Sequence, residues 1–113
     1  MTGDLEAVVD LGEIRRIKTI TVGFLSDQEH WIFPPAAVEY SLGSTRENMR
    51  TVFAKKLDTV KTTQAKIENV SAQMKSARAR YVRVKAKNIG LCPAWHPGAG
   101  RKAWLFVDEI MVK

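Results

Sequence analysis

Tryptophan and histidine stand next to each other twice in this sequence, each time in a segment typical of a loop. His30 and Trp31 lie between a polar run and a proline pair, and Trp95 and His96 lie between two further prolines. A sugar presents an apolar C–H face and a rim of hydroxyl groups, so its site needs an aromatic ring beside a few fixed hydrogen-bonding groups. The two segments therefore indicate carbohydrate binding by loops.

Some of the tryptophans could instead have a structural role. Trp31 is followed by Ile32 and Phe33, a cluster that could close one end of the fold. Trp104 stands in an almost wholly apolar segment and is predicted to lie in the core. Trp95 and its neighbour His96 are the pair we expect to face solvent.

Catalytic patterns are missing from the sequence. A glycosidase needs two carboxyl groups about 5 to 10 Å apart across a cleft. Asp108 and Glu109 are adjacent on an expected strand, so their side chains point to opposite faces. The sequence also lacks the serine elbow, the zinc-protease motif and the glycine-rich phosphate loop. We expect this chain by itself not to be an enzyme.

The charge balance is basic, with 18 Lys and Arg against 12 Asp and Glu and a net charge of +6. Basic residues are spread from Arg15 to Lys113, and the densest stretch, 78–87, alternates charged with small apolar residues. Such alternation is typical of a solvated strand face, so no nucleic-acid partner is expected. No apolar run approaches the roughly 18 residues of a membrane span, and the first residues have no signal-peptide pattern.

The single cysteine, Cys92, excludes an internal disulfide and is expected to be a buried apolar residue. Its spacing to His96 would suit half of a zinc site. However, there is no second cysteine, and the only other histidine is His30. The sequence does not predict a zinc site.

Alternating patterns predict β-strands along most of the chain. Between 44 and 89 there is neither Gly nor Pro, and Met49, Phe53 and Leu57 could also be aligned as a helical stripe. A polar, proline-containing loop at 26–37 and a second long loop at 92–102 separate the clearer strands. We expect these strands at 5–11, 17–24, 38–42, 81–87 and 103–112.

Three segments carry a resemblance to a known family: 4–12 (DLEAVVDLG), 79–86 (ARYVRVKA) and 92–110 (CPAWHPGAG followed by AWLFVDEI). They resemble discoidin-like domains, also called coagulation factor type C domains. The chain is similar to the C-terminal domains of bacterial family 20 β-N-acetylhexosaminidases (chitobiases) and to family 32 carbohydrate-binding modules. The resemblance implies a galactose-binding-like jelly-roll β-sandwich with seven strands, two of them at 51–57 and 67–74, in a single domain spanning 1–113.

The resemblance also implies a function. The chain would be a non-catalytic, carbohydrate-binding accessory module of a secreted bacterial glycoside hydrolase, located outside the cell, in the periplasm or at the cell surface. Its partners would be a glycan of N-acetylhexosamine or galactose type and the parent catalytic domain. Galactose-binding members use a histidine, an arginine and a loop aromatic residue, which here would be His30, Arg101 and Trp95.

Many such modules hold a structural calcium ion through an N-terminal loop and a glutamate of the last strand, here Glu109. That loop is not found before Asp4, so the chain is expected to be a fragment that lacks the N-terminal segment of the domain. Two alternatives stay open. The chain could be a structural domain that packs on the catalytic domain without binding sugar. It could also be a membrane or protein adhesion module that uses Trp31 and Phe33 as apolar spikes.

Overall fold

The chain folds into β-strands joined by loops, with one short 3-10 turn. The computed structural model describes residues 3–113. All strand pairs are antiparallel, and the strand order in the sheet is β3-β2-β4-β1-β5. In chain order the elements are β1 (Leu5–Ser26), η1 (Gln28–His30), β2 (Ala37–Gly43), β3 (Met49–Lys56), β4 (Lys66–Lys87) and β5 (Val107–Val112).

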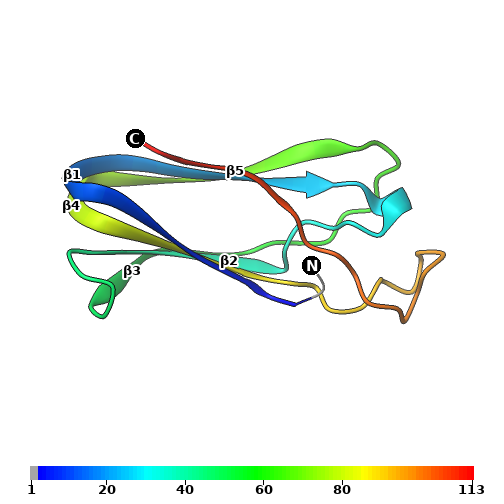
Figure 1. The fold of residues 1–113 in the computed structure, drawn as a ribbon. Helices are drawn as coiled ribbons and strands as arrows, with labels where there is room; N and C mark the ends of the chain where they lie inside the picture. Colours follow the sequence, from blue (N-terminus) through cyan, green and yellow to red (C-terminus); the bar gives the residue numbers. More distant parts are fainter. Residues whose placement is uncertain (1–2) are drawn as a thin grey trace.

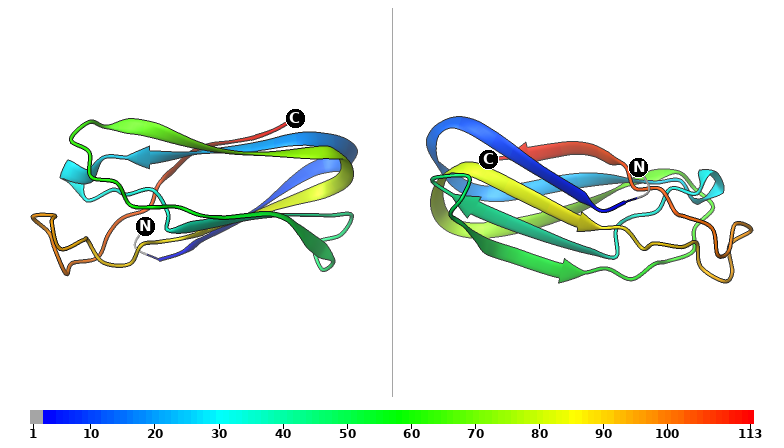
Figure 2. Two further views of the ribbon diagram at one scale, coloured as in Figure 1. Left: turned by 180° about the vertical axis from the view of Figure 1, so that it is seen from behind. Right: turned by 60° about the horizontal axis from the view of Figure 1, so that its bottom comes forward.

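The two long strands, β1 and β4, are bent double together, so that one sheet forms two facing layers (Figure 1). In the first layer, residues 5–10 of β1 pair with 81–86 of β4, and β2 and β3 continue the sheet. In the second layer, residues 19–26 of β1 pair with 66–73 of β4, and β5 forms the edge. Figure 2 shows the layers from two further directions, joined at one end by the bends.

Two residues in the left-handed backbone region mark the bends. Gly12 has φ +85° in β1, and Ser76 has φ +50° in β4. The ladder shifts register between Asp10 and Arg15 and resumes beyond it. Arg80 holds the bend from outside, because its guanidinium donates to both carboxylate oxygens of Asp10, at 2.8 and 3.0 Å.

The core lies between the two layers and follows the alternation of the strands. Ile20, Val22 and Phe24 of the second layer are fully buried against the first layer. Tyr40 of β2 links the layers, since its hydroxyl donates to the carbonyl of Val70 at 2.8 Å. Burial raises the pKa of this phenol, so the donor stays protonated at neutral pH.

The expected all-β class is confirmed, and every expected strand lies wholly or partly within an observed one. Two pairs of expected strands, however, are single strands that continue through the bends. The helical alternative for the middle of the chain is wrong, because Met49 and Phe53 belong to β3. The core position expected for Trp104 is also wrong: its neighbours Ala103 and Leu105 point inward, and the indole is 42% exposed.

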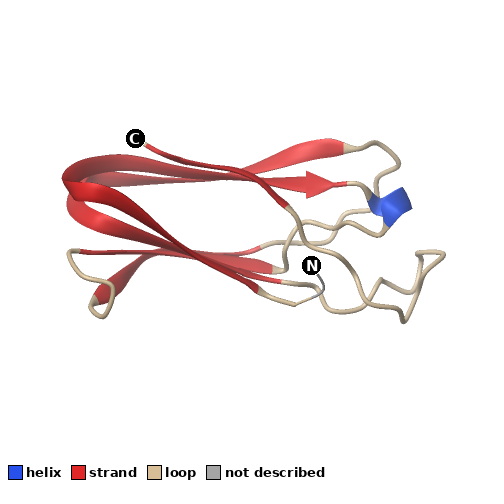
Figure 3. Ribbon diagram, in the orientation of Figure 1, coloured by secondary structure: helices blue, strands red, loops and turns tan. Residues whose placement is uncertain are grey.

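The turn between β2 and β3 lies at the same end as the bends, and the other loops gather at the opposite end (Figure 3). A second, smaller apolar cluster closes the sandwich there and consists of Phe33, Cys92 and Ala103, with Trp31 and Ile89 against it. Within residues 3–113, no helix is long and apolar enough to cross a membrane.

The bend geometry predicts opposite effects for two substitutions. Gly12→Ala should lower the free energy of unfolding by about 1 to 2 kcal/mol, because a Cβ is disfavoured at positive φ although no atom lies within 4 Å of it. Ser76→Gly should raise that free energy by up to about 1 kcal/mol, because it relieves the same strain. Urea unfolding measures both; destabilisation by Ser76→Gly would contradict the assigned bend.

The ion pair at the bend predicts a pH dependence. The hydrogen bonds from Arg80, helped by the backbone N–H of Gly12, lower the pKa of Asp10 from 3.8 to about 2. Since the pKa is lower in the folded state, the pair stabilises the fold above about pH 4, and this contribution is lost as the pH falls toward 2. Asp10→Asn should therefore show a flatter loss of stability over this range in urea titrations. Asp58→Asn, at an exposed site with no ion pair among the described residues, should behave as wild type.

Candidate functional site

Three loops meet at the end of the sandwich opposite the bends: 27–36, 57–65 and 88–106. The first is closed on itself, because Asp27 and Ile32 exchange two backbone hydrogen bonds of 2.9 and 3.0 Å around η1. The third is pinned by Asn88, whose side-chain amide donates to the carbonyl of Ala103 at 3.1 Å. Hydrogen bonds within each of these two loops thereby fix its conformation.

The buried side chain of Gln28 joins the loops to one another. Its amide nitrogen donates to the carbonyl of Val60 at 2.7 Å, and its amide oxygen accepts from the backbone N–H of Thr62 at 3.1 Å. The backbone carbonyl of Gln28 accepts from the Nε2 of His96, in the third loop. A single residue of η1 therefore fixes all three loops, and it is only 5% exposed.

His96 is held at both ring nitrogens. The backbone N–H of Gly98 donates to its Nδ1 at 2.9 Å, so the proton lies on Nε2, which donates to the carbonyl of Gln28. The expectation that His96 faces solvent is wrong, because its imidazole is 6% exposed and packs edge-on against the rings of Trp31, Phe33 and Trp95. Its geometry makes it the residue that positions the aromatic rings.

Gly98 allows the third loop to lie directly on Trp31. A Cβ added at this glycine would come within 2.8 Å of the indole Cε2 atom. On the same ring, the guanidinium carbon of Arg101 lies 5.9 Å from the ring centroid, a cation–π contact. Trp31 itself has a left-handed backbone, with φ +64°, directly after η1.

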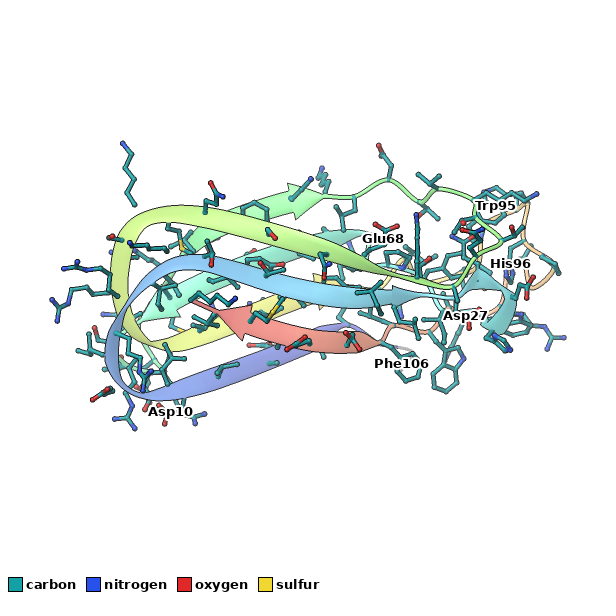
Figure 4. All side chains as sticks on the ribbon, turned by 90° about the horizontal axis from the view of Figure 1, so that it is seen from above. Asp10, Asp27, Glu68, Trp95, His96 and Phe106 are labelled. Carbon is teal, nitrogen blue, oxygen red and sulfur yellow. The ribbon has the colours of Figure 1, made fainter. Side chains whose placement is uncertain are left out.

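A pocket of about 360 Å³ opens between the three loops, a volume in the range of small-ligand sites. Trp95 is 40% exposed at the pocket, and the Nζ of Lys61 lies 5.7 Å from its ring centroid. Figure 4 labels Trp95 and His96 at this end of the molecule. The lining consists of two indoles, one imidazole and several hydrogen-bonding side chains: Gln28, Glu29, Trp31, Lys61, Thr62, Thr63, Trp95, His96 and Pro97.

A larger hollow, of about 720 Å³, crosses the strands of the first layer. Small side chains, Ala37 and Ala54, lie within it, and lysines and carboxylates surround them. No aromatic ring lines it, so it lacks the flat apolar surface that a sugar face requires. The smaller pocket between the loops is the better candidate for a carbohydrate.

The structure brings Trp31, Trp95 and His96 together, as the two-loop hypothesis expects. His30 and Arg101 are not among the pocket residues. The side chain of His30 is 74% exposed and bonded to Asp27 at 2.8 Å, and Arg101 covers Trp31 outside the pocket lining.

Two further predictions concern Phe33 and Glu109. Phe33 cannot serve as an exposed spike, because it is 1% exposed in the loop-end cluster. The calcium ligand role of Glu109 stays a prediction. Calcium takes six to eight oxygen ligands, and no group of three or more His, Cys, Asp or Glu suited to a metal occurs in the part of the chain described.

Cys92 is buried, as expected, and burial raises the pKa of its thiol. The thiol packs in the cluster of Phe33 and Ala103. A buried, protonated thiol is a poor nucleophile. The role of Cys92 is therefore packing at the base of the site.

Several pocket residues were missed by sequence reasoning. Lys61, Thr62 and Thr63 belong to a polar stretch without any periodic pattern, so nothing in the sequence placed them beside the tryptophans. Gln28 belongs to the polar part of the loop expected at 26–37, and nothing in the sequence indicated that its side chain is buried. The one signal in the sequence was Gly98, which follows Trp95 and His96 closely. A glycine at such a place can mark a close approach of the backbone to an aromatic ring, as it does here to Trp31.

Comparison with known proteins does not identify the chain. No family model matches it, and no curated protein sequence matches it significantly. Membership of the discoidin-like family therefore stays a prediction from the motifs.

The bridging role of Gln28 predicts that Gln28→Met loosens the loop end. The substitution leaves the carbonyl of Val60 and the N–H of Thr62 without partners, which should cost about 1 to 3 kcal/mol of unfolding free energy. Amide hydrogen exchange at Thr62 should speed up more than exchange of the core amides of β4, which follow only the change in global stability. Gln73→Met, at an exposed site on β4, is the control. Equal exchange rates in both variants would show that Gln28 does not hold the loops.

Proposed function

We propose that this chain is a non-catalytic carbohydrate-binding module, with its sugar site in the pocket between the three loops. The observation that carries the proposal is the pairing of a half-exposed indole, Trp95, with charged and hydroxyl groups in one pre-formed pocket. Rigid aromatic surface next to fixed polar groups is what a sugar face and its hydroxyl rim require.

The proposed roles follow from the chemistry of the lining. The indole of Trp95 would stack on the C–H face of the sugar. Lys61 would donate to ring hydroxyls, and the carboxylate of Glu29 would accept from them. Trp31, packed on Gly98 and fixed beside His96, would form the opposite wall. The ligand class is a neutral hexose or N-acetylhexosamine, such as galactose or N-acetylglucosamine.

In this proposal the chain is a discoidin-like jelly-roll domain that serves a secreted bacterial glycoside hydrolase of the β-N-acetylhexosaminidase type. The parent enzyme would break the glycosidic bond. The module would keep the enzyme close to its glycan, so that a weak sugar site gives a large gain through effective concentration.

A second candidate function has an observation of its own. Trp104 and Phe106 are exposed on the outside of the loop end, 42% and 43%, with ring centroids 6.1 Å apart and planes at 11°. The carbonyl of Phe106 accepts from the N–H of Leu25, whose register partner is the exposed Ile67. This apolar row, from Phe106 across Leu25 to Ile67, lies on the second layer (Figure 4, where Phe106 is labelled). It would suit packing on a catalytic domain without sugar binding.

The two candidates are separated by a matched pair of variants, Trp95→Ala and Trp104→Ala, whose indoles are 40% and 42% exposed. Calorimetric titration with galactose, N-acetylglucosamine and N-acetylgalactosamine should show at least about tenfold weaker binding for Trp95→Ala, since aromatic stacking is lost. Trp104→Ala should bind as wild type.

The reverse pattern would move the sugar site to the outer aromatic row. No binding of any sugar by the folded wild-type chain would leave the packing function as the better account. Because Trp95 contacts Phe33 of the loop-end cluster, one-dimensional NMR of each variant checks that the fold is kept.

A further inference from the structure

The net positive charge of the chain lies at the end of the sandwich opposite the sugar pocket. We call this region the basic end; it comprises the bends of β1 and β4, the turn between β2 and β3, and the adjoining C-terminal residue. The carbonyl of Lys113 accepts from the N–H groups of Lys18 and Thr19. Its basic residues are Arg15, Arg16, Lys18, Arg46, Arg50, Lys75, Arg78, Arg80 and Lys113.

Only three acidic residues accompany these nine: Asp10, Glu13 and Glu47. The rest of the chain contains nine basic and nine acidic residues, which cancel. The surplus at the basic end therefore equals the whole net charge of +6. Basic residues that are spread along the sequence come together here, because the bends bring segments far apart in sequence to one end of the molecule (Figure 4, where Asp10 marks this end).

The basic end holds uncompensated charge at a structural cost. Arg16 and Arg78 are directly opposite in the β1–β4 register, and both are exposed. Among residues 3–113 neither has an acidic partner within 4 Å. Like charges opposite each other in an antiparallel pair are destabilising, and a carboxylate at either position would relieve this. Both positions are nevertheless arginine.

Two of the three acidic residues at the basic end already interact with arginines of the chain. Asp10 is held by Arg80, and Glu13 lies 3.6 Å from Arg15. Further along the outer face of the first layer, Arg83 has a buried Nε without any hydrogen-bond partner in the described chain. Arg83 lies outside the basic end, and its buried Nε is not open to a ligand.

We propose that the basic end binds an acidic polysaccharide through its sulfate or carboxylate groups. Six of the eight arginines lie there, whereas most lysines lie toward the loops. The planar guanidinium matches the paired oxygens of sulfate and carboxylate, and it is less strongly hydrated than an ammonium group. The partner is therefore an anion bound by forked hydrogen bonds along a polymer.

Nucleic acid and membrane fit this surface less well. The single aromatic ring at the basic end is Tyr81, and the guanidinium carbons of Arg46 and Arg80 lie 5.2 and 5.1 Å from its centroid. One ring does not supply the series of aromatic side chains on which successive bases of a single strand stack. Ile14, at the tip of the β1 bend, is the one large apolar side chain exposed there in residues 3–113. Insertion into a bilayer would require more apolar surface.

This inference goes beyond the proposed sugar site and does not depend on it. The molecule is 46 Å long, and the pocket and the basic end lie at its two extremes. One chain could therefore hold a neutral sugar and an acidic polymer at the same time. Failure of the two functions is distinguishable, because Trp95→Ala should leave polyanion binding unchanged.

The test is fluorescence anisotropy with labelled heparin and labelled polygalacturonate at low ionic strength, comparing two variants of equal charge. Arg16→Gln/Arg78→Gln should weaken binding by about tenfold or more, and the affinity of wild type should fall steeply with added salt. The control, Lys55→Gln/Lys56→Gln, removes two charges toward the loop end and should bind nearly as wild type. Equal weakening in both variants would overturn a localised site. Because heparin carries carboxylates as well as sulfates, tighter binding of heparin assigns the gain to sulfate groups, whereas equal or tighter binding of polygalacturonate shows that carboxylates suffice.

Two further readouts complete the test. Tighter binding of a DNA duplex, or of phosphatidylglycerol vesicles, than of either polysaccharide would overturn the proposed partner. Arg78→Glu should weaken heparin binding while raising the melting temperature, because it places opposite charges across the strand pair. A variant that loses both stability and binding would show that Arg78 supports the fold rather than a ligand.

Discussion

The antiparallel pairing of β1 with β4 runs through both layers, and the rest of the molecule depends on where this ladder bends. Gly12 and Ser76 take left-handed backbone angles, so the paired strands turn back together and their apolar faces meet. Tyr40 then joins the layers by a hydrogen bond to Val70. Because the fold is closed at the bends, the three remaining loops gather at the open end.

The two ends of the sandwich consequently differ in chemistry. At the open end, Gln28 and His96 fix the loops by hydrogen bonds that leave little freedom to the aromatic rings beside them. At the bent end, arginines from distant segments converge, and Asp10 compensates only part of their charge. A rigid aromatic pocket and an arginine-rich surface are therefore both consequences of one topology, and they suit neutral sugars and acidic polymers respectively.

The strands could be predicted because alternating residues such as Ile20, Val22 and Phe24 record one buried face. The bends could not, since Ser76 has a common residue type in an uncommon conformation. Within the site, the Trp95 and His96 pair was visible in the sequence. The loop at 57–65, which supplies Lys61, Thr62 and Thr63, has no periodic sequence pattern. Whether His96 faces solvent or is buried depends on Gln28 and Gly98, contacts that only the folded chain reveals.

The central claim is that the pocket between the loops is a carbohydrate site. An amide-resolved NMR titration of the whole chain with N-acetylglucosamine, galactose and N-acetylgalactosamine tests it most directly. Saturable shifts confined to Glu29, Lys61, Thr63 and Trp95 and their neighbours, with the basic end unaffected, are the predicted result. Shifts elsewhere, or none with any of the three sugars in a folded sample, would contradict the account.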